Sequence, residues 1–154
     1  MAAGDITAQL ETASKFKSAM FDGIDDVVTI TPTDRLKNLK TFTLCAMIRM
    51  TAQNTGSRFV AGIDNGTVDT AYSIQVQGVG FPKNIACRVS ANTNVVKTGT
   101  ATLLENVWYH ITGRYNGTNI EVFKDGVPSG IPSAIVGDVR IIASDFTIGN
   151  RVGG

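Results

Sequence analysis

The segment Phe21-Asp22-Gly23-Ile24-Asp25-Asp26-Val27-Val28-Thr29-Ile30 joins a tight Asp-Gly turn to a run of β-forming residues. A second segment of this kind starts at Trp108-Tyr109-His110-Ile111 and ends at Lys124-Asp125-Gly126-Val127. Asp-Gly pairs favour tight hairpin turns, because both residues tolerate positive φ. Standing at opposite ends of one strand-rich domain, the two segments predict an all-β fold, a two-sheet antiparallel jelly-roll sandwich.

Working outward from these segments, short β runs separated by turns fill the rest of the chain. Apolar residues alternate from Phe42 to Met50 and predict a long strand. The other face of that strand carries Thr43, Cys45, Met47 and Arg49 and is not strongly polar. We therefore expect another part of the protein, or a partner, to cover that face too. No stretch keeps a helical period, and turn signals recur at roughly ten-residue intervals, as in a sandwich or jelly roll. Further strands are expected at 18–22, 26–30, 58–63, 71–77, 84–90, 94–97, 107–115, 120–123, 139–142 and 146–148, with a short helical turn or loop at 36–40.

Length and composition bound the class of protein. The 154 residues fit one domain, which we place at 18–154 behind an N-terminal arm at 1–17. The net charge of +1 predicts no attraction to nucleic acid or to anionic membranes. The first twenty residues lack the apolar core of a signal peptide, and no apolar stretch could span a bilayer. We therefore expect synthesis in the cytoplasm, unless a targeting segment was removed before this numbering begins.

The order of the motifs resembles the concanavalin A-like lectin/glucanase superfamily, in particular its laminin G-like jelly-roll branch. That branch carries an early Phe-Asp-Gly followed by Asp and a β run, then a strand similar to 42–48, although Met47 stands where the family often has Trp. Later motifs also fit in order and spacing: Trp108 and His110, Tyr115-Asn116-Gly117-Thr118, Phe123-Lys124-Asp125-Gly126-Val127, and Ile148-Gly149. The resemblance covers about residues 18–150 and implies a domain for adhesion or binding.

One departure from the family pattern concerns the end of the chain. Family members continue past the final Ile-Gly with a closing strand beside the first strand, whereas this sequence stops at Arg151-Val152-Gly153-Gly154. Unless the chain is cut short, the first strand is expected to lack its usual neighbour, and the N-terminal arm or another subunit would fill the edge. An unpaired edge promotes association, so we expect a homo-oligomer or a capsid lattice.

Catalytic motifs are missing from the sequence, and we expect no enzyme. The glucanase branch places its carboxylates as Glu-x-Asp-x-x-Glu on one strand, and none of Glu11, Glu105 and Glu121 lies in such a motif. A lone histidine, His110, does not make a nucleophilic triad, and packing beside Trp108 or a turn hydrogen bond is the favoured interpretation. The two cysteines, Cys45 and Cys87, are expected to be separate reduced thiols.

Two kinds of ligand site have candidate residues. Calcium, which the family often holds at the sheet rim, would find oxygen donors at Asp25, Asp64, Asn65 and Asp69, but Asp and Asn also favour turns for backbone reasons alone, and this second interpretation is preferred. Sugars would stack on exposed aromatic rings, with Tyr72, Phe81 and Trp108 as candidates, although burial in the core is favoured for each ring.

Two classes of function remain open. The first is a non-catalytic structural or decoration module on a virus or phage particle, which would explain how an extracellular type of fold reaches the outside without an export signal. The alternative is a carbohydrate-binding adhesion module of a secreted or surface protein. Partners are therefore expected to be other protein chains, with glycans as the alternative, and neither nucleic acid nor membrane insertion.

Overall fold

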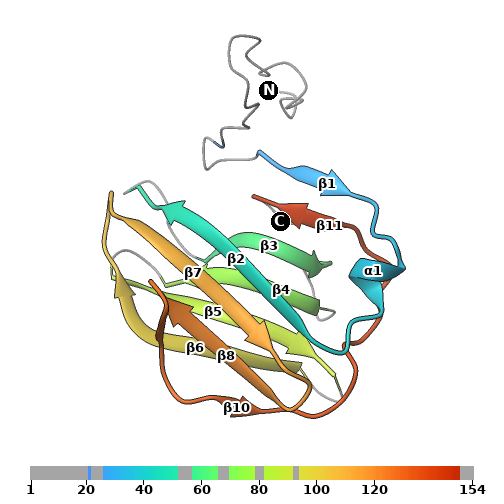
Figure 1. Cartoon of the computed structure of the whole chain (residues 1–154). Helices are drawn as coiled ribbons and strands as arrows, with labels where there is room; N and C mark the ends of the chain where they lie inside the picture. Colours follow the sequence, from blue (N-terminus) through green and yellow to red (C-terminus); the bar gives the residue numbers. More distant parts are fainter. Residues whose placement is uncertain are drawn as a thin grey trace.

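The computed structural model of the chain describes residues 21, 26–51, 57–65, 70–78, 82–91 and 94–149. Two antiparallel sheets lie face to face around one apolar core (Figure 1). The six-stranded sheet has the order β1-β11-β3-β4-β5-β6, and the five-stranded sheet has the order β10-β8-β7-β2 with β9 beside β8. The elements are β1 (Val28–Ile30), α1 (Asp34–Lys37), β2 (Phe42–Arg49), β3 (Arg58–Asp64), β4 (Thr70–Gln77), β5 (Lys83–Ser90), β6 (Asn94–Leu103), β7 (Trp108–Tyr115), β8 (Asn119–Lys124), β9 (Val127–Pro128), β10 (Ser133–Ala134) and β11 (Phe146–Ile148).

Most of the predicted strands are present, and the predicted all-β jelly-roll class is confirmed. The strand expected at 139–142 is wrong, because that segment is a loop. Val139 and Ile142 are both buried in the core, and the segment makes single hydrogen bonds instead of a strand ladder: the Val139 amide donates to the Leu39 carbonyl oxygen at 2.9 Å, and the Arg140 amide donates to the carbonyl oxygen of Ser90 at the end of β5 at 2.7 Å. The expected strand at 94–97 is longer, since β6 continues to Leu103. The predicted arm at 1–17 lies outside the described residues, as does the strand at 18–22 apart from Phe21.

Within the described ranges, no helix is both long and apolar enough to cross a membrane.

The first strand does have a neighbour, which corrects the expectation of a missing closing strand. β1 pairs with β11 in a register that sets Val28 against Ile148, and β11 pairs on its other side with β3. The two motifs at opposite ends of the chain meet here: a Cβ built on Gly149 would lie 2.5 Å from the Phe21 ring. Gly149 also has a φ of +95°, which L side chains rarely adopt. The segment 146–148 is therefore the strand that lies beside the first strand, and β1 is the last described strand at this end of the six-stranded sheet.

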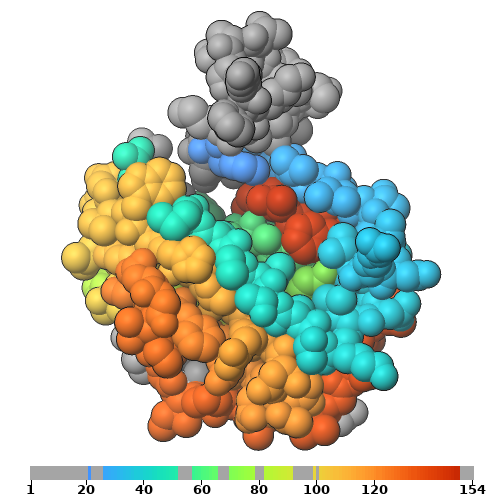
Figure 2. Space-filling model, viewed as in Figure 1, coloured from blue at the N-terminus to red at the C-terminus, as the bar shows by residue number. Residues whose placement is uncertain are grey.

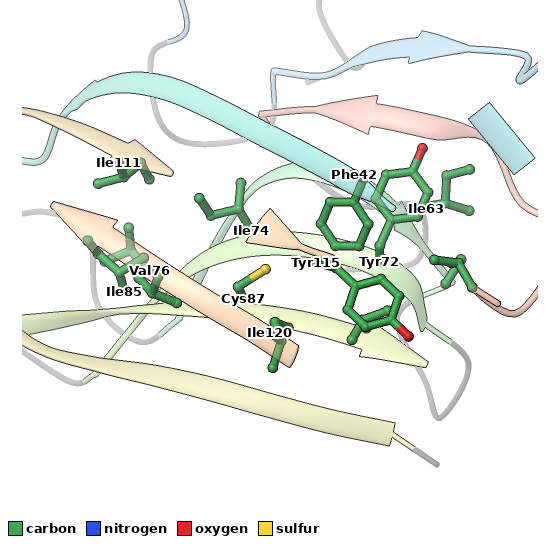
Figure 3. Close-up of a cluster of buried hydrophobic side chains, with 14 of the residues drawn as sticks. Phe42, Ile63, Tyr72, Ile74, Val76, Ile85, Cys87, Ile111, Tyr115 and Ile120 are labelled. Carbon is green, nitrogen blue, oxygen red and sulfur yellow. The ribbon is translucent and has the colours of Figure 1, made fainter. Parts of the chain in front are cut away.

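The core lies between the sheets and is filled from both of them (Figure 3). At one end the rings of Phe42 and Tyr72 lie 4.9 Å apart between centroids, and the Tyr72 hydroxyl donates to the carbonyl oxygen of Leu36 at 2.9 Å. In the middle, the thiol of Cys87 on β5 lies beneath Gly113 of β7. Cys45 is exposed and Cys87 is buried, and both are free, which confirms the expectation of two separate thiols.

Both tight turns that the sequence predicts are present, and the second also leads into β9, a short strand that the sequence does not predict. Asn116-Gly117 joins β7 to β8, and the Asn116 side-chain oxygen accepts hydrogen bonds from the amides of Thr118 and Asn119 at 3.0 and 2.8 Å. Asp125-Gly126 joins β8 to β9 with φ values of +51° and +78°, the positive pair that a two-residue type I′ turn requires. Both turns fix the register of β7 and β8, which carry most of the site described next.

Candidate binding face

The outward side chains of three strands form one surface of the five-stranded sheet. Alternation in β2, β7 and β8 turns every second residue away from the core, and the register then places these residues in rows. Arg49 lies opposite Trp108, Met47 opposite His110, and Cys45 opposite Thr112. Figure 2 shows β2, β7 and β8 from this side. We call this surface the front face; its residues are Thr43, Cys45, Met47, Arg49, Trp108, His110, Thr112, Arg114, Glu121 and Phe123.

One end of the front face is apolar and open to solvent. Trp108 and Met47 keep 58% and 59% of their surface exposed. The guanidinium carbon of Arg49 lies 5.6 Å from the centroid of the Trp108 ring, within the range of a cation–π contact. Leu104 and Val107, in the connection that enters β7, are also exposed. Large apolar side chains gather here on the face of a sandwich where polar residues are expected.

A backbone turn holds Trp108 in this position. Asn106 has a φ of +60°, and its amide donates to the carbonyl oxygen of Met50 at 2.8 Å, which ties the turn to the end of β2. Tyr109 then faces the core, and its hydroxyl accepts from the amide of Leu104 at 3.1 Å. With Tyr109 anchored inward, strand alternation leaves Trp108 outside.

The middle of the front face contains the single histidine. The amide of His110 donates to the carboxylate oxygen Oδ1 of Asp125 at 2.9 Å, and the Asp125 amide donates back to the His110 carbonyl oxygen at 2.7 Å. The carboxylate therefore fixes the turn after β8 and aligns it with β7. Both bonds involve the main chain of His110, so the interpretation favoured for its imidazole stays a prediction.

The far end of the front face is polar and internally paired. Arg114 donates from Nε to Glu121 Oε2 at 2.7 Å, and its guanidinium carbon lies 5.3 Å from the centroid of the Phe123 ring. The ion pair occupies the front-face carboxylate of Glu121. Among the described residues no group of three His, Cys, Asp or Glu side chains could hold a metal ion. This face offers aromatic, apolar and cationic groups to a partner.

Two of the three aromatic ligand candidates lie among the described residues, and they differ in exposure to solvent. Tyr72 lies inside the sandwich with 1% of its surface exposed, and burial raises its pKa to about 12. It has no ring face to offer a sugar, because Phe42 and Phe146 pack around it. Trp108 is exposed, so the expectation of core burial is wrong for this ring. Phe81 lies outside the described residues.

The calcium candidates give a mixed result. Asp64, at the end of β3, is buried, and its Oδ2 accepts hydrogen bonds from Thr70 Oγ1 at 3.0 Å and Gln75 Nε2 at 3.3 Å. The Arg88 guanidinium lies 3.6 Å from the same oxygen and already supplies the positive charge that a cation would bring. The Asp64 carboxylate is therefore committed to side chains, which argues against its use as a ligand. Asn65 follows directly, whereas Asp25 and Asp69 lie outside the described residues, and calcium stays a prediction there.

Arg49 and Met47 are the site residues that sequence reasoning did not single out. Their signal was present in the alternation of β2, whose outward positions are only weakly polar. The pattern predicts a cover for this face, but no described segment provides one, since Thr43, Cys45, Met47 and Arg49 are all exposed. The contact of Arg49 with Trp108 depends on the register between β2 and β7, which neither strand encodes alone.

Comparison with known proteins agrees with this architecture. A laminin G-type family model, described as the concanavalin A-like lectin/glucanases superfamily, matches residues 22–154. The chain belongs to this superfamily. None of the curated proteins compared with the chain matches it.

Solved structures of the same superfamily fold are similar at low sequence identity. A native heptameric SAP-like pentraxin from Limulus polyphemus aligns with a TM-score of 0.58 and 15% identity over 83% of this chain and 66% of its own. An alginate lyase from Alteromonas sp. 272 aligns with a TM-score of 0.50 and 16% identity over 77% of this chain and 56% of its own. The enzymatically active domain of tailspike protein 2 from bacteriophage CBA120 aligns with a TM-score of 0.50 and 13% identity over 82% of this chain and 24% of its own. The chain thus spans less than two thirds of each structure, and the fold they share occurs in a pentraxin, in an alginate lyase and in a phage tailspike.

Proposed function

We propose that the chain is a non-catalytic structural module that decorates a virus or phage particle, with its front face as the surface that contacts another protein. The observation that carries this proposal is the exposed cluster of Trp108, Met47 and Arg49. Exposed apolar groups of this size mark interaction surfaces, and tryptophan and arginine are the residues that most often dominate the energy of a protein interface. The same fold occurs in a bacteriophage tailspike, so a virion role is compatible with it.

The chemistry of the front face supports binding more than catalysis. Hydrolysis of a glycosidic bond uses two carboxyl groups across the substrate. Glu121 is engaged by Arg114, and Asp125 is engaged by the amide of His110. Both carboxylates are therefore held by contacts within the protein, an arrangement that favours binding over catalysis. The proposed location is the virion, reached by assembly; an extracellular location is the alternative.

The test is a particle-association assay with the variant Trp108→Ala. Particles are sedimented from cells that express the wild-type or the variant chain, and chain copies per particle are counted by quantitative immunoblotting. Loss of a central tryptophan is expected to weaken binding at least about 30-fold, from a cost of roughly 2 kcal/mol. Ile131→Ala, at an exposed residue between β9 and β10 that is not one of the front-face residues, serves as the control and should bind normally. Wild-type chain that stays in the supernatant would rule out the particle role.

Carbohydrate binding is the second candidate, favoured by the geometry around the Trp108 ring. An exposed indole beside a guanidinium and an imidazole combines an apolar stacking surface with polar groups that orient a ligand. On a glycan array, a lectin would give a Trp108-dependent signal that Arg49→Ala weakens, whereas a purely structural module would give none. Sugar binding without particle association would replace the first proposal with this one.

A further inference from the structure

β2 has one long edge that faces no other strand in the described part of the chain. All eight of its residues pair with β7 in an unbroken register, from Phe42 opposite Tyr115 to Arg49 opposite Trp108. β2 is also the last strand of the five-stranded sheet. As far as the described residues extend, its other side therefore presents a row of main-chain N–H and C=O groups with no strand beside it. Such a row is a template for another strand.

This edge carries none of the usual protection against pairing. Soluble proteins guard sheet edges with proline, bulges, inward charges or very short strands. β2 contains no proline, its register has no bulge, and its single charge, Arg49, stands at its end. The six residues between Phe42 and Arg49 are all uncharged.

The edge strands of the rest of the molecule differ from β2. β6, at the end of the six-stranded sheet, has an irregular register with β5. Its main chain is partly satisfied by side chains, since the Ala101 amide donates to Ser129 Oγ at 3.0 Å and the Thr102 carbonyl oxygen accepts from Lys124 Nζ at 3.3 Å. β1 has three residues, and β9 and β10 have two each. Among the described strands, β2 is therefore the long, regular and unguarded edge.

The inward side chains of β2 indicate what kind of strand would cover this edge. Leu44, Ala46 and Ile48 pack against the core but remain only half-buried. On the neighbouring strand β7, the inward residues Ile111 and Tyr115 are fully buried, with 0% and 1% exposed. A strand with apolar side chains on the same side would complete the burial of the first three residues.

We propose that β2 pairs with β2 of a second copy of the chain, antiparallel and across a two-fold axis, so that the two five-stranded sheets become one continuous sheet. Charge favours this occupant and this direction. Antiparallel pairing sends the two Arg49 side chains to opposite ends of the pair, whereas parallel pairing in register would place them side by side. A two-fold centred on Cys45 or Ala46 keeps apolar side chains inward in both copies, as the pleat requires.

This pairing adds to the proposed function, because it joins two front faces into one surface with a Trp108 cluster toward each end. The dimer would then be bivalent for any partner of that face, with a gain in avidity that needs no new contact. The pairing itself requires no particle and no glycan, so its failure and the failure of the proposed function are separable.

The first test measures the size of the full chain in reducing buffer by multi-angle light scattering over a concentration series. We expect a wild-type dimer. The variant C45K/M47K places lysines opposite each other for either centre of the two-fold, and should raise the dimer dissociation constant on the order of tenfold or more. Both positions are exposed in one chain, so circular dichroism should show an unchanged fold.

The control variant V127K/I131K replaces two exposed apolar residues at the opposite side of the same sheet and should remain a dimer. A wild-type chain that is monomeric up to millimolar concentration would overturn the proposal. So would a C45K/M47K variant that dimerises like the wild type, or a control variant that loses the dimer.

The second test uses the exposed thiol as a reporter. Burial raises the pKa of Cys87 to about 12, so at pH 8 a maleimide reacts with Cys45 alone. If the two-fold axis passes through Cys45, the two Cys45 residues lie directly opposite each other. If it passes through Ala46, they lie on the diagonal, about 7–8 Å apart. A short bis-maleimide should therefore link wild-type dimers, and the link should vanish on dilution below the dissociation constant. Absence of the linked species in a dimeric sample would place the interface elsewhere.

Discussion

A single glycine determines how closely the two sheets approach in the middle of the core. Gly113 takes an inward position of β7 between Ile111 and Tyr115, where alternation alone calls for a large apolar residue. A Cβ at this position would lie 2.5 Å from Sγ and 3.0 Å from Cβ of Cys87. The Cys87 sulfur of the six-stranded sheet thus fills the space that a side chain at position 113 of the five-stranded sheet would occupy. The sequence shows both residues but gives no sign that they meet.

Gly113→Ala should destabilise the protein by about 1–3 kcal/mol, the usual cost of overpacking a core. The measurement is the free energy of unfolding from urea titration. In a Cys87→Ala background the sulfur is gone, and the same substitution should cost clearly less. Equal costs in the two backgrounds would mean that the contact with Cys87 is not the cause.

The exposure of Trp108 shows how far single residues can be predicted. Alternation along β7 already separates Trp108 and His110 from Tyr109 and Ile111, and this separation is correct. Predicting burial for Trp108 required a further layer over that face, which periodicity cannot supply. The weakly polar outward residues of β2 predict such a layer, but a surface without a cover has the same residue pattern.

At the scale of elements, the sequence predicts turns between neighbouring residues, but it does not predict which distant strands pair. The turns at Asn116-Gly117 and Asp125-Gly126 involve adjacent residues, so the sequence predicts both turns, although it predicts no strand after the second. The insertion of β11 between β1 and β3 joins segments more than eighty residues apart, and nothing in either segment specifies it. The predicted open edge was therefore assigned to the first strand, whereas the long open edge among the described strands is β2.

At the scale of the whole molecule, buried acids make stability depend on alkaline pH. Burial raises the pKa of Cys87 from 9.0 to about 12 and that of Tyr72 from 10.0 to about 12. Burial also raises the pKa of Tyr115, and the negative charge of Asp138 adds to the effect. These groups keep their protons in the folded chain at pH values where the unfolded chain releases them.

Stability should therefore be unaffected by these groups below about pH 9 and should fall as the pH rises from 9 towards 12. Each proton released only on unfolding lowers the free energy of unfolding by about 1.4 kcal/mol per pH unit. Urea titrations at pH 8, 9 and 10 measure the effect. The decline between pH 9 and 10 should shrink in Cys87→Ala, which lacks the first group to ionise. An identical decline in that variant would contradict the assignment to Cys87.

The position of β11 also bears on how the chain is made. β1 is attached to the six-stranded sheet through β11, and β11 is the last described strand to leave the ribosome. In a nascent chain that ends after β8, β1 therefore still lacks the strand that pairs it with the sheet. Folding of this edge must wait until β11 has been made, as expected for a fold whose contacts join distant parts of the sequence. Until then β3 offers a bare edge of its own, and a second copy that is also unfinished could pair there by mistake.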